Sequence, residues 1–201
     1  MMRHWLLIAI IVLLLAPLPA PAGNRLVATG VRTAVAQSLL TVVPDRDWNR
    51  LGRRPGSNAE RWTLDGPQLN ALNFYGGIAD DRPLFRDRDH RNSPLPHFAA
   101  TMLPTDITAL FENSYRVAIG TSLMTIDSSA PTVFAGAAGL RFTYHFVVQG
   151  EEIERQGIGE AAVIDKKLYM ITFEAPSLHY FAAGLPSYHR IAASARRAPL
   201  R

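Results

Sequence analysis

The residues with the most potential for chemistry lie in a segment rich in aspartate and histidine, residues 80–97. Its acidic and imidazole side chains are Asp80, Asp81, Asp87, Asp89, His90 and His97. Carboxylate oxygens and imidazole nitrogens can bind calcium, manganese or zinc. Asp87, Asp89 and His90 are therefore candidate metal ligands. The segment lacks the central glycine and terminal glutamate that an EF-hand loop requires, so it predicts no calcium site of that type.

The same segment also carries basic residues between its aspartates, namely Arg82, Arg86, Arg88 and Arg91. Oppositely charged neighbours of this kind pair with one another at the surface, where each pair adds little stability. A solvated, self-paired loop is therefore the first interpretation of the segment, and a metal site is the alternative. The sequence predicts no cofactor.

The usual catalytic motifs are missing elsewhere in the chain. We find neither the G-x-S-x-G turn of serine hydrolases nor the H-E-x-x-H pair of zinc proteases. Glycine patterns that cradle phosphates or dinucleotides are also absent. The chain has no cysteine, which excludes disulfides, thiol catalysis and cysteine-bound metal. A binding protein is therefore expected more than an enzyme.

Strands are the main elements expected around this segment. Apolar and β-branched patterns predict strands at 39–43, 61–64, 72–75, 140–148, 153–164 and 168–174. In 140–148, Leu140, Phe142 and Tyr144 alternate with polar residues, as in a half-buried antiparallel strand. The last three strands are predicted to form a meander. Apolar residues at helical spacing predict one helix at 105–119, with Thr105 as its N-cap.

A second helix is predicted from about Pro186 to the basic C-terminal residues. Strands in a run, with one helix before the last three and one after them, indicate an α+β fold, an antiparallel sheet flanked by helices. Large aromatic residues, Trp48, Trp62, Phe74 and Tyr75, are expected mainly in its core. The alternative is that they line a ligand groove.

The first 22 residues have the pattern of a cleavable secretory signal. Arg3 precedes an uncharged apolar run at 5–15, and small residues at Ala20 and Ala22 match the A-x-A rule of signal peptidase. The apolar run is shorter than the about 20 residues of a membrane-spanning helix. We therefore expect residues 1–22 to be removed and the mature protein to be periplasmic or secreted, without stable membrane insertion.

The rest of the chain fits one domain of ordinary size. Residues 23–37 are small and polar and predict a flexible leader, 38–197 form the globular domain, and 198–201 form a tail. The formal net charge is +4, and Arg3 of the signal supplies one of these charges. Basic residues alternate with acidic ones instead of forming a block, so no nucleic-acid partner is expected.

Several short motifs resemble a known family. These are Phe134-Ala-Gly, Gly139-Leu-Arg-Phe-Thr-Tyr, Lys167-Leu-Tyr-Met-Ile-Thr-Phe-Glu-Ala and Ile191-Ala-Ala-Ser. With the order of the predicted elements, they resemble the PsbP-like (Mog/PsbP) fold over roughly residues 38–197. Trp62-Thr-Leu-Asp-Gly-Pro and Asn73-Phe-Tyr-Gly-Gly-Ile are similar to a subgroup of uncharacterised exported proteins of Gram-negative bacteria. The resemblance implies an α/β/α sandwich, a non-enzymatic binding or assembly role, and no catalytic residues.

Two functional hypotheses follow from these patterns. The first is a periplasmic binding or assembly module whose partner is an unidentified envelope protein or small ligand. Its recognition surface is expected in the long loop between Gly76 and Phe98, since loops beyond about 12 to 15 residues are often functional. Asp87, Arg88, Asp89 and Tyr75 are the candidate contact residues. The alternative is a metal-dependent hydrolase that uses the acidic loop 80–97.

We predict that the exported protein begins at Gly23. Signal peptidase needs small side chains before the cleaved bond, so Ala22→Tyr should block processing. Intact mass of protein from a periplasmic extract measures the outcome. A full-length, membrane-bound product of the wild-type gene, or unchanged cleavage of the Ala22→Tyr variant, would show that the assignment is wrong.

Overall fold

The computed structural model describes residues 23–87, 89, 91–121, 123–148 and 150–199. The predicted signal at 1–22 and the last two residues of the tail therefore lie outside the described residues. So do Arg88 and His90, which the sequence predicts as contact residue and metal ligand.

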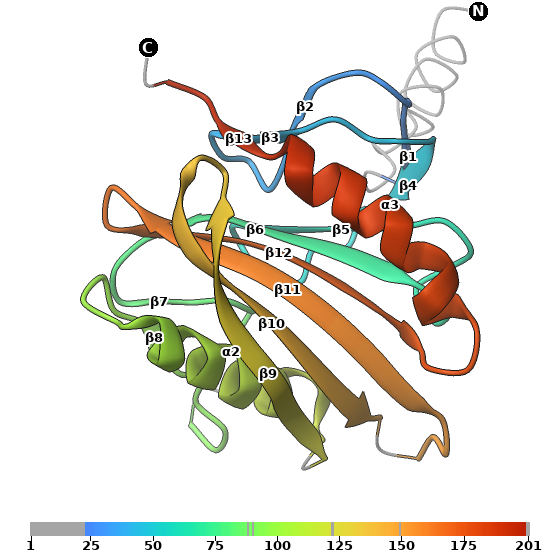
Figure 1. Cartoon of the computed structure of the whole chain (residues 1–201). Coiled ribbons are helices and arrows are strands. Elements are labelled where there is room, and N and C mark those ends of the chain that lie inside the picture. The colour runs from blue at the N-terminus through green and yellow to red at the C-terminus, as the bar shows by residue number, and fades with distance from the viewer. Residues whose placement is uncertain (1–22, 88, 90, 122, 149, 200–201) are drawn as a thin grey trace, which may run out of the picture.

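The centre of the fold is an eight-stranded sheet in the order β1-β4-β5-β6-β12-β11-β10-β9 (Figure 1). The strands are β1 (Arg25–Val27), β4 (Trp48–Arg50), β5 (Ala59–Thr63), β6 (Ala71–Ile78), β9 (Met124–Phe134), β10 (Ala137–Val147), β11 (Glu154–Ile164) and β12 (Lys167–Pro176). All neighbouring strands pair antiparallel. The sequence-distant strands β6 and β12 meet in the middle of the sheet. The predicted α+β class is confirmed.

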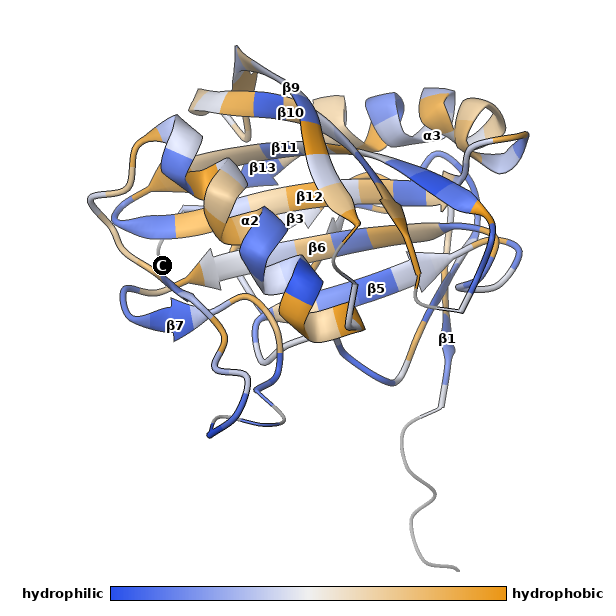
Figure 2. Cartoon of the chain, turned by 90° about the horizontal axis from the view of Figure 1, so that it is seen from below, coloured by the Kyte–Doolittle hydropathy of each residue, from blue (hydrophilic) through white to orange (hydrophobic). Residues whose placement is uncertain are grey.

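Two helices cover the sheet, one on each face: α2 (Pro104–Ile119) and α3 (Tyr180–Ser194) (Figure 1 and Figure 2). Ile107 and Phe111 of α2 pack in one buried cluster, and Tyr188 and Ile191 of α3 pack in the other. The result is the expected α/β/α sandwich. Two small sheets complete the fold, β13 (Arg196–Arg197) with β3 (Leu40–Val42) and β2 (Thr33–Ala34), and β7 (Arg82–Pro83) with β8 (His97–Phe98).

The alternation predicted for residues 140–148 is present in β10. Phe142 and Tyr144 are fully buried, whereas Thr143 between them is only half-buried. Their rings lie over Gly157 and Gly159 of the neighbouring strand, where a Cβ atom would overlap the Tyr144 and Phe142 rings. This close approach explains why β11 has two glycines inside a strand, where glycine otherwise weakens a sheet.

The predicted start of structure at Ser38 is wrong. Within the expected leader, β1 pairs with β4, β2 pairs with β3, and Val27 and Val35 are buried. These short strands have no periodic pattern of their own. They form because distant strands supply their hydrogen-bond partners, which the local sequence does not show.

Other elements also differ from the prediction, and one strand and both helices show the clearest differences. Strand β9 was not expected, because most of its residues are exposed and no alternation marks it. Helix α3 begins at Tyr180, with Pro186 inside it. Helix α2 begins after Leu103 instead of Thr105: Pro104 occupies its first turn, and the Asp106 carboxylate accepts a 2.8 Å hydrogen bond from the Leu103 N–H. Asp106 therefore caps the helix and also suits its dipole.

We predict that Phe142→Ala lowers the free energy of unfolding by about 3 to 5 kcal/mol, because it removes a fully buried ring. Thr143→Ala, on the opposite face of the same strand, should change it by no more than about 0.5 kcal/mol. Urea denaturation of both variants measures the difference. Equal losses would show that the two faces of β10 are not distinguished as described.

Candidate functional site

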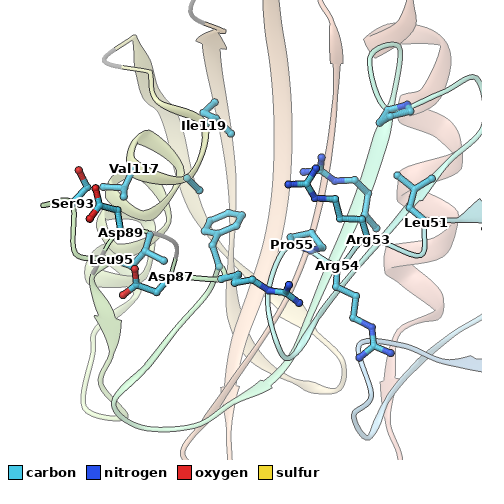
Figure 3. A pocket seen from close by; sticks show the side chains of 15 residues that line it. Leu51, Arg53, Arg54, Pro55, Asp87, Asp89, Ser93, Leu95, Val117 and Ile119 are labelled. Atoms are coloured by element: carbon cyan, nitrogen blue, oxygen red, sulfur yellow. The ribbon is translucent and has the colours of Figure 1, made fainter. Parts of the chain in front are cut away.

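A pocket of about 420 Å³ opens on the α2 side of the sheet, between the loop that follows β4 and the segment 85–95. Its lining residues are Leu51, Arg53, Arg54, Pro55, Arg61, Pro67, Phe85, Arg86, Asp87, Asp89, Ser93, Leu95, Val117, Ala118 and Ile119. We call it the arginine pocket, after Arg53, Arg54, Arg61 and Arg86. In Figure 3, Arg53, Arg54 and Pro55 lie on one side and Asp87, Asp89 and Val117 on the other.

The two loops around the pocket are joined by their backbones. The Arg86 N–H donates a 2.8 Å hydrogen bond to the Pro55 carbonyl. Next to it, a Cβ at Gly56 would overlap the Leu84 carbonyl, so only glycine allows this close approach. The contact therefore fixes the backbones of the two loops relative to each other.

Segment 85–95 is anchored by its apolar residues. Phe85 is 6% exposed, and its ring packs edge-on against Tyr75 of β6 at 5.7 Å and Tyr115 of α2 at 5.8 Å between centroids. Leu84 and Leu95 are also buried. The segment lacks regular structure over most of its length, but it is held against the body of the domain.

Arg61 connects the pocket to the core. It lies on β5, with 25% of its side chain exposed. Its Nε donates a 2.6 Å hydrogen bond to Asn73 Oδ1 on β6, and its Nη2 lies 3.5 Å from Glu174 Oε1 on β12. Burial acts to lower the pKa of Arg61, but the Glu174 carboxylate and, to a smaller extent, the neighbouring tyrosines together outweigh it and raise the pKa. The guanidinium therefore stays charged.

Glu174 is almost fully buried and is satisfied from several sides. The Tyr115 hydroxyl donates to Glu174 Oε2, and the Tyr144 hydroxyl lies 3.3 Å from the same oxygen. Burial, assisted by the charge of Glu174, raises the pKa of both tyrosines well above the usual range, so both remain neutral donors. Glu174 thus links three sheet strands, β5, β10 and β12, to helix α2.

The chemistry of the pocket is that of an anion receptor. Within the described residues, nothing pairs with Nη1 of Arg61, and the side chains of Arg53, Arg54 and Arg86 make no hydrogen bond or ion pair. Four arginines and two aspartates, Asp87 and Asp89, supply the charged groups that line it. Guanidinium groups bind carboxylates and phosphates through paired hydrogen bonds.

The structure separates the predicted contact residues. Asp87 and Asp89 line the pocket, and Asp89 accepts hydrogen bonds of 3.0 and 3.1 Å from the Asn92 side chain. Tyr75 has no exposed surface, so its expected role as a partner contact is wrong. Its ring packs against Phe85 and Phe111, because segment 85–95 and helix α2 both cover β6. The prediction that Trp48, Trp62 and Phe74 belong to the core is confirmed by their complete burial.

The candidate metal site is not completed by the described part of the chain, where no three histidine, aspartate or glutamate residues converge. His97 forms a pair with Asp81, with 2.8 Å between Nδ1 and Oδ1. A site formed by Asp87, Asp89 and His90 stays a prediction, since His90 is not described.

The sequence patterns did not indicate that Arg53, Arg54 and Arg61 line a pocket, or that Glu174 is the partner of Arg61. Arg53 and Arg54 stand in a segment with Gly52, Pro55 and Gly56, a composition typical of a loop, and no motif marks them as binding residues. The available signals were the charged residues Arg61 and Glu174, each in a segment predicted as a strand. Charges at such positions are rarely buried unless they are paired.

We predict that Glu174→Gln lowers the free energy of unfolding by about 3 kcal/mol, because it leaves the Arg61 charge without its buried partner. The value is at the low end for a broken buried pair, since Arg61 is partly exposed. Glu112→Gln is the matched control. It breaks an i,i+4 pair with Arg116 near the helix surface and should cost less than about 1 kcal/mol. Equal losses in thermal or urea unfolding would contradict the role given to Glu174.

No known protein family matches the sequence, and no curated protein matches it. Solved structures do. Cyanobacterial PsbP (CyanoP) from Synechocystis sp. PCC 6803 is 11% identical with a TM-score of 0.53, over 90% of this chain and 96% of that protein.

Two other solved structures are less similar. PA94 of Pseudomonas aeruginosa, a protein of unknown function, is 9% identical with a TM-score of 0.40, over 66% of this chain and 76% of its own. LpqN of Mycobacterium tuberculosis, involved in cell envelope biogenesis, is 8% identical with a TM-score of 0.36, over 90% of this chain and 87% of its own. At these TM-scores neither carries an argument about this protein. The similarity to CyanoP and the order of the elements show that the domain has the PsbP-like fold.

Proposed function

We propose that this protein is an exported, periplasmic binding module, not an enzyme, and that the arginine pocket is its recognition site. The observation that carries the proposal is Arg61. It is held as a charged group by Asn73 and Glu174, and its Nη1 has no partner among the described residues. A cation that the core positions at considerable cost suits a site that receives an anionic group.

The pocket also has the size and position expected of a recognition site. Its volume of about 420 Å³ lies in the usual range of ligand pockets, about 300 to 1,000 Å³. It is formed where the long loop between Gly76 and Phe98 meets the loop after β4, so the part of the chain predicted to recognise a partner forms one of its walls. This arrangement supports a binding role.

The proposal of export rests on the sequence of residues 1–22, with its charged start, apolar run and small residues before Gly23. In the described residues, no helix combines the length and apolar character needed to cross a membrane. The resemblance to the PsbP-like family adds the expectation of a non-enzymatic role.

Photo-crosslinking in living cells tests the recognition site. A photoreactive residue replaces Ser93, which is exposed and lines the pocket, and in a second strain it replaces Lys166, which is exposed in the turn between β11 and β12. We expect the Ser93 position to give adducts of defined mass, either small molecules or protein, that the Lys166 position does not give. Intact-mass spectrometry of the purified protein detects both kinds of adduct.

The double variant Arg53→Gln/Arg86→Gln is the control for the pocket itself. Combined with the photoreactive residue at 93, it should lose the specific adducts, because it removes two of the four arginines and leaves the fold unchanged. Identical adducts at positions 93 and 166, or none at 93, would refute the pocket as the recognition site.

A further inference from the structure

The arginine pocket combines two kinds of wall. Four arginines supply the cationic part, and Phe85, Leu95, Val117, Ala118 and Ile119 supply an apolar part. We infer that the ligand is an amphiphilic anion, with a carboxylate or phosphate head bound by the arginines and a short aliphatic chain against the C-terminal turn of α2. This inference rests on the proposed function, because it names the ligand class of the same pocket.

The head would be held first by Arg61. Asn73 holds its guanidinium group at Nε and Glu174 holds it at Nη2. The guanidinium group is planar, so Nη1 points away from both contacts. A donor that is already ordered loses little conformational entropy on binding. Arg53 and Arg86, which are exposed and pair with no described side chain, can close on the same head. An arginine can bind either a carboxylate or a phosphate through paired hydrogen bonds.

The acidic groups near the pocket determine which wall the anionic head of the ligand contacts. Glu174 already accepts from Tyr115 and faces Arg61, and Asp89 accepts from Asn92. Asp87 and Asp89 lie on the side opposite Arg53 and Arg54 (Figure 3). They would repel an anionic head from their own wall and leave it with the arginines.

The chain would be bound by the apolar part. Val117 is an apolar residue near the end of α2, and 39% of it is exposed. Ala118 and Ile119, which follow it, are half-buried. Phe85 and Leu95, which also line the pocket, are almost fully buried. Burial of each methylene group is favourable by an amount that corresponds to roughly a threefold to fourfold gain in affinity. Affinity should therefore rise with chain length.

Isothermal titration calorimetry of the purified full chain, as processed by its host, tests the ligand class. The probes are octanoate and octyl phosphate, with butanoate and inorganic phosphate as short-chain controls and octylamine as the cationic control. We expect both octyl anions to bind at least tenfold more tightly than their short-chain controls, and octylamine not to bind. The tighter of the two octyl anions identifies the head, a fatty-acid carboxylate or a lipid phosphate.

Two variants locate the binding. Arg53→Gln/Arg86→Gln should weaken the octyl anion at least tenfold without lowering the melting temperature, and Val117→Gln, which removes apolar surface without adding a charge, should weaken it as well. Arg82→Gln is the matched control for charge, because Arg82 is exposed on β7 and does not line the pocket. It should leave the affinity unchanged within twofold.

Several results would overturn the inference. Equal binding of butanoate and octanoate would mean that charge alone attracts the ligand, and tighter binding of octylamine would mean that the acidic wall selects it. An equal loss in Arg82→Gln would show non-specific attraction. If Ser93 crosslinks specifically but neither octyl anion binds, the binding role stands and the ligand class is wrong; if neither result appears, both fail.

Discussion

The buried contact between Arg61 and Glu174 is the constraint on which the recognition side of the molecule depends. Two charges removed from water are stable only when their remaining hydrogen-bonding groups are satisfied. Asn73 does this for Arg61, and Tyr115 and Tyr144 do it for Glu174. These partners come from β6, α2 and β10, so the network fixes the helix on the sheet. It also holds one cation at the base of the pocket.

On the α3 side, buried carboxylates serve the fold instead. Glu60 accepts hydrogen bonds from the Trp62 indole at 2.6 Å and the Ala36 N–H at 3.1 Å, which attaches the N-terminal segment to the sheet. Asp45 binds Ser187 and Arg190 of α3. In both cases the chain itself supplies the donors. The α2 side of the sheet differs from the α3 side, because Arg61 keeps one donor, its Nη1, that no described residue uses.

The local patterns of the sequence were sufficient to predict helix α2 and the meander of β10, β11 and β12. Alternation along 140–148 identified the buried face of β10, and helical spacing identified α2. Both signals are periodic, and a period of two or 3.6 residues depends only on the geometry of one element. The predicted export signal is likewise a property of residues 1–22 alone. The order of these elements was enough to suggest the PsbP-like fold, and the similarity to CyanoP confirms it.

Only the tertiary structure determines two features of the protein. These are the strands whose sequences show no hydrophobic alternation and the arginine pocket. Strands β1 and β2 exist because β4 and β3 pair with them, and Tyr75 is buried because Phe85 and α2 close over it. Arg53 and Arg86 lie in loops that meet through one backbone hydrogen bond. Contacts between residues far apart in the chain depend on how whole elements pack, and no spacing within the sequence records that packing.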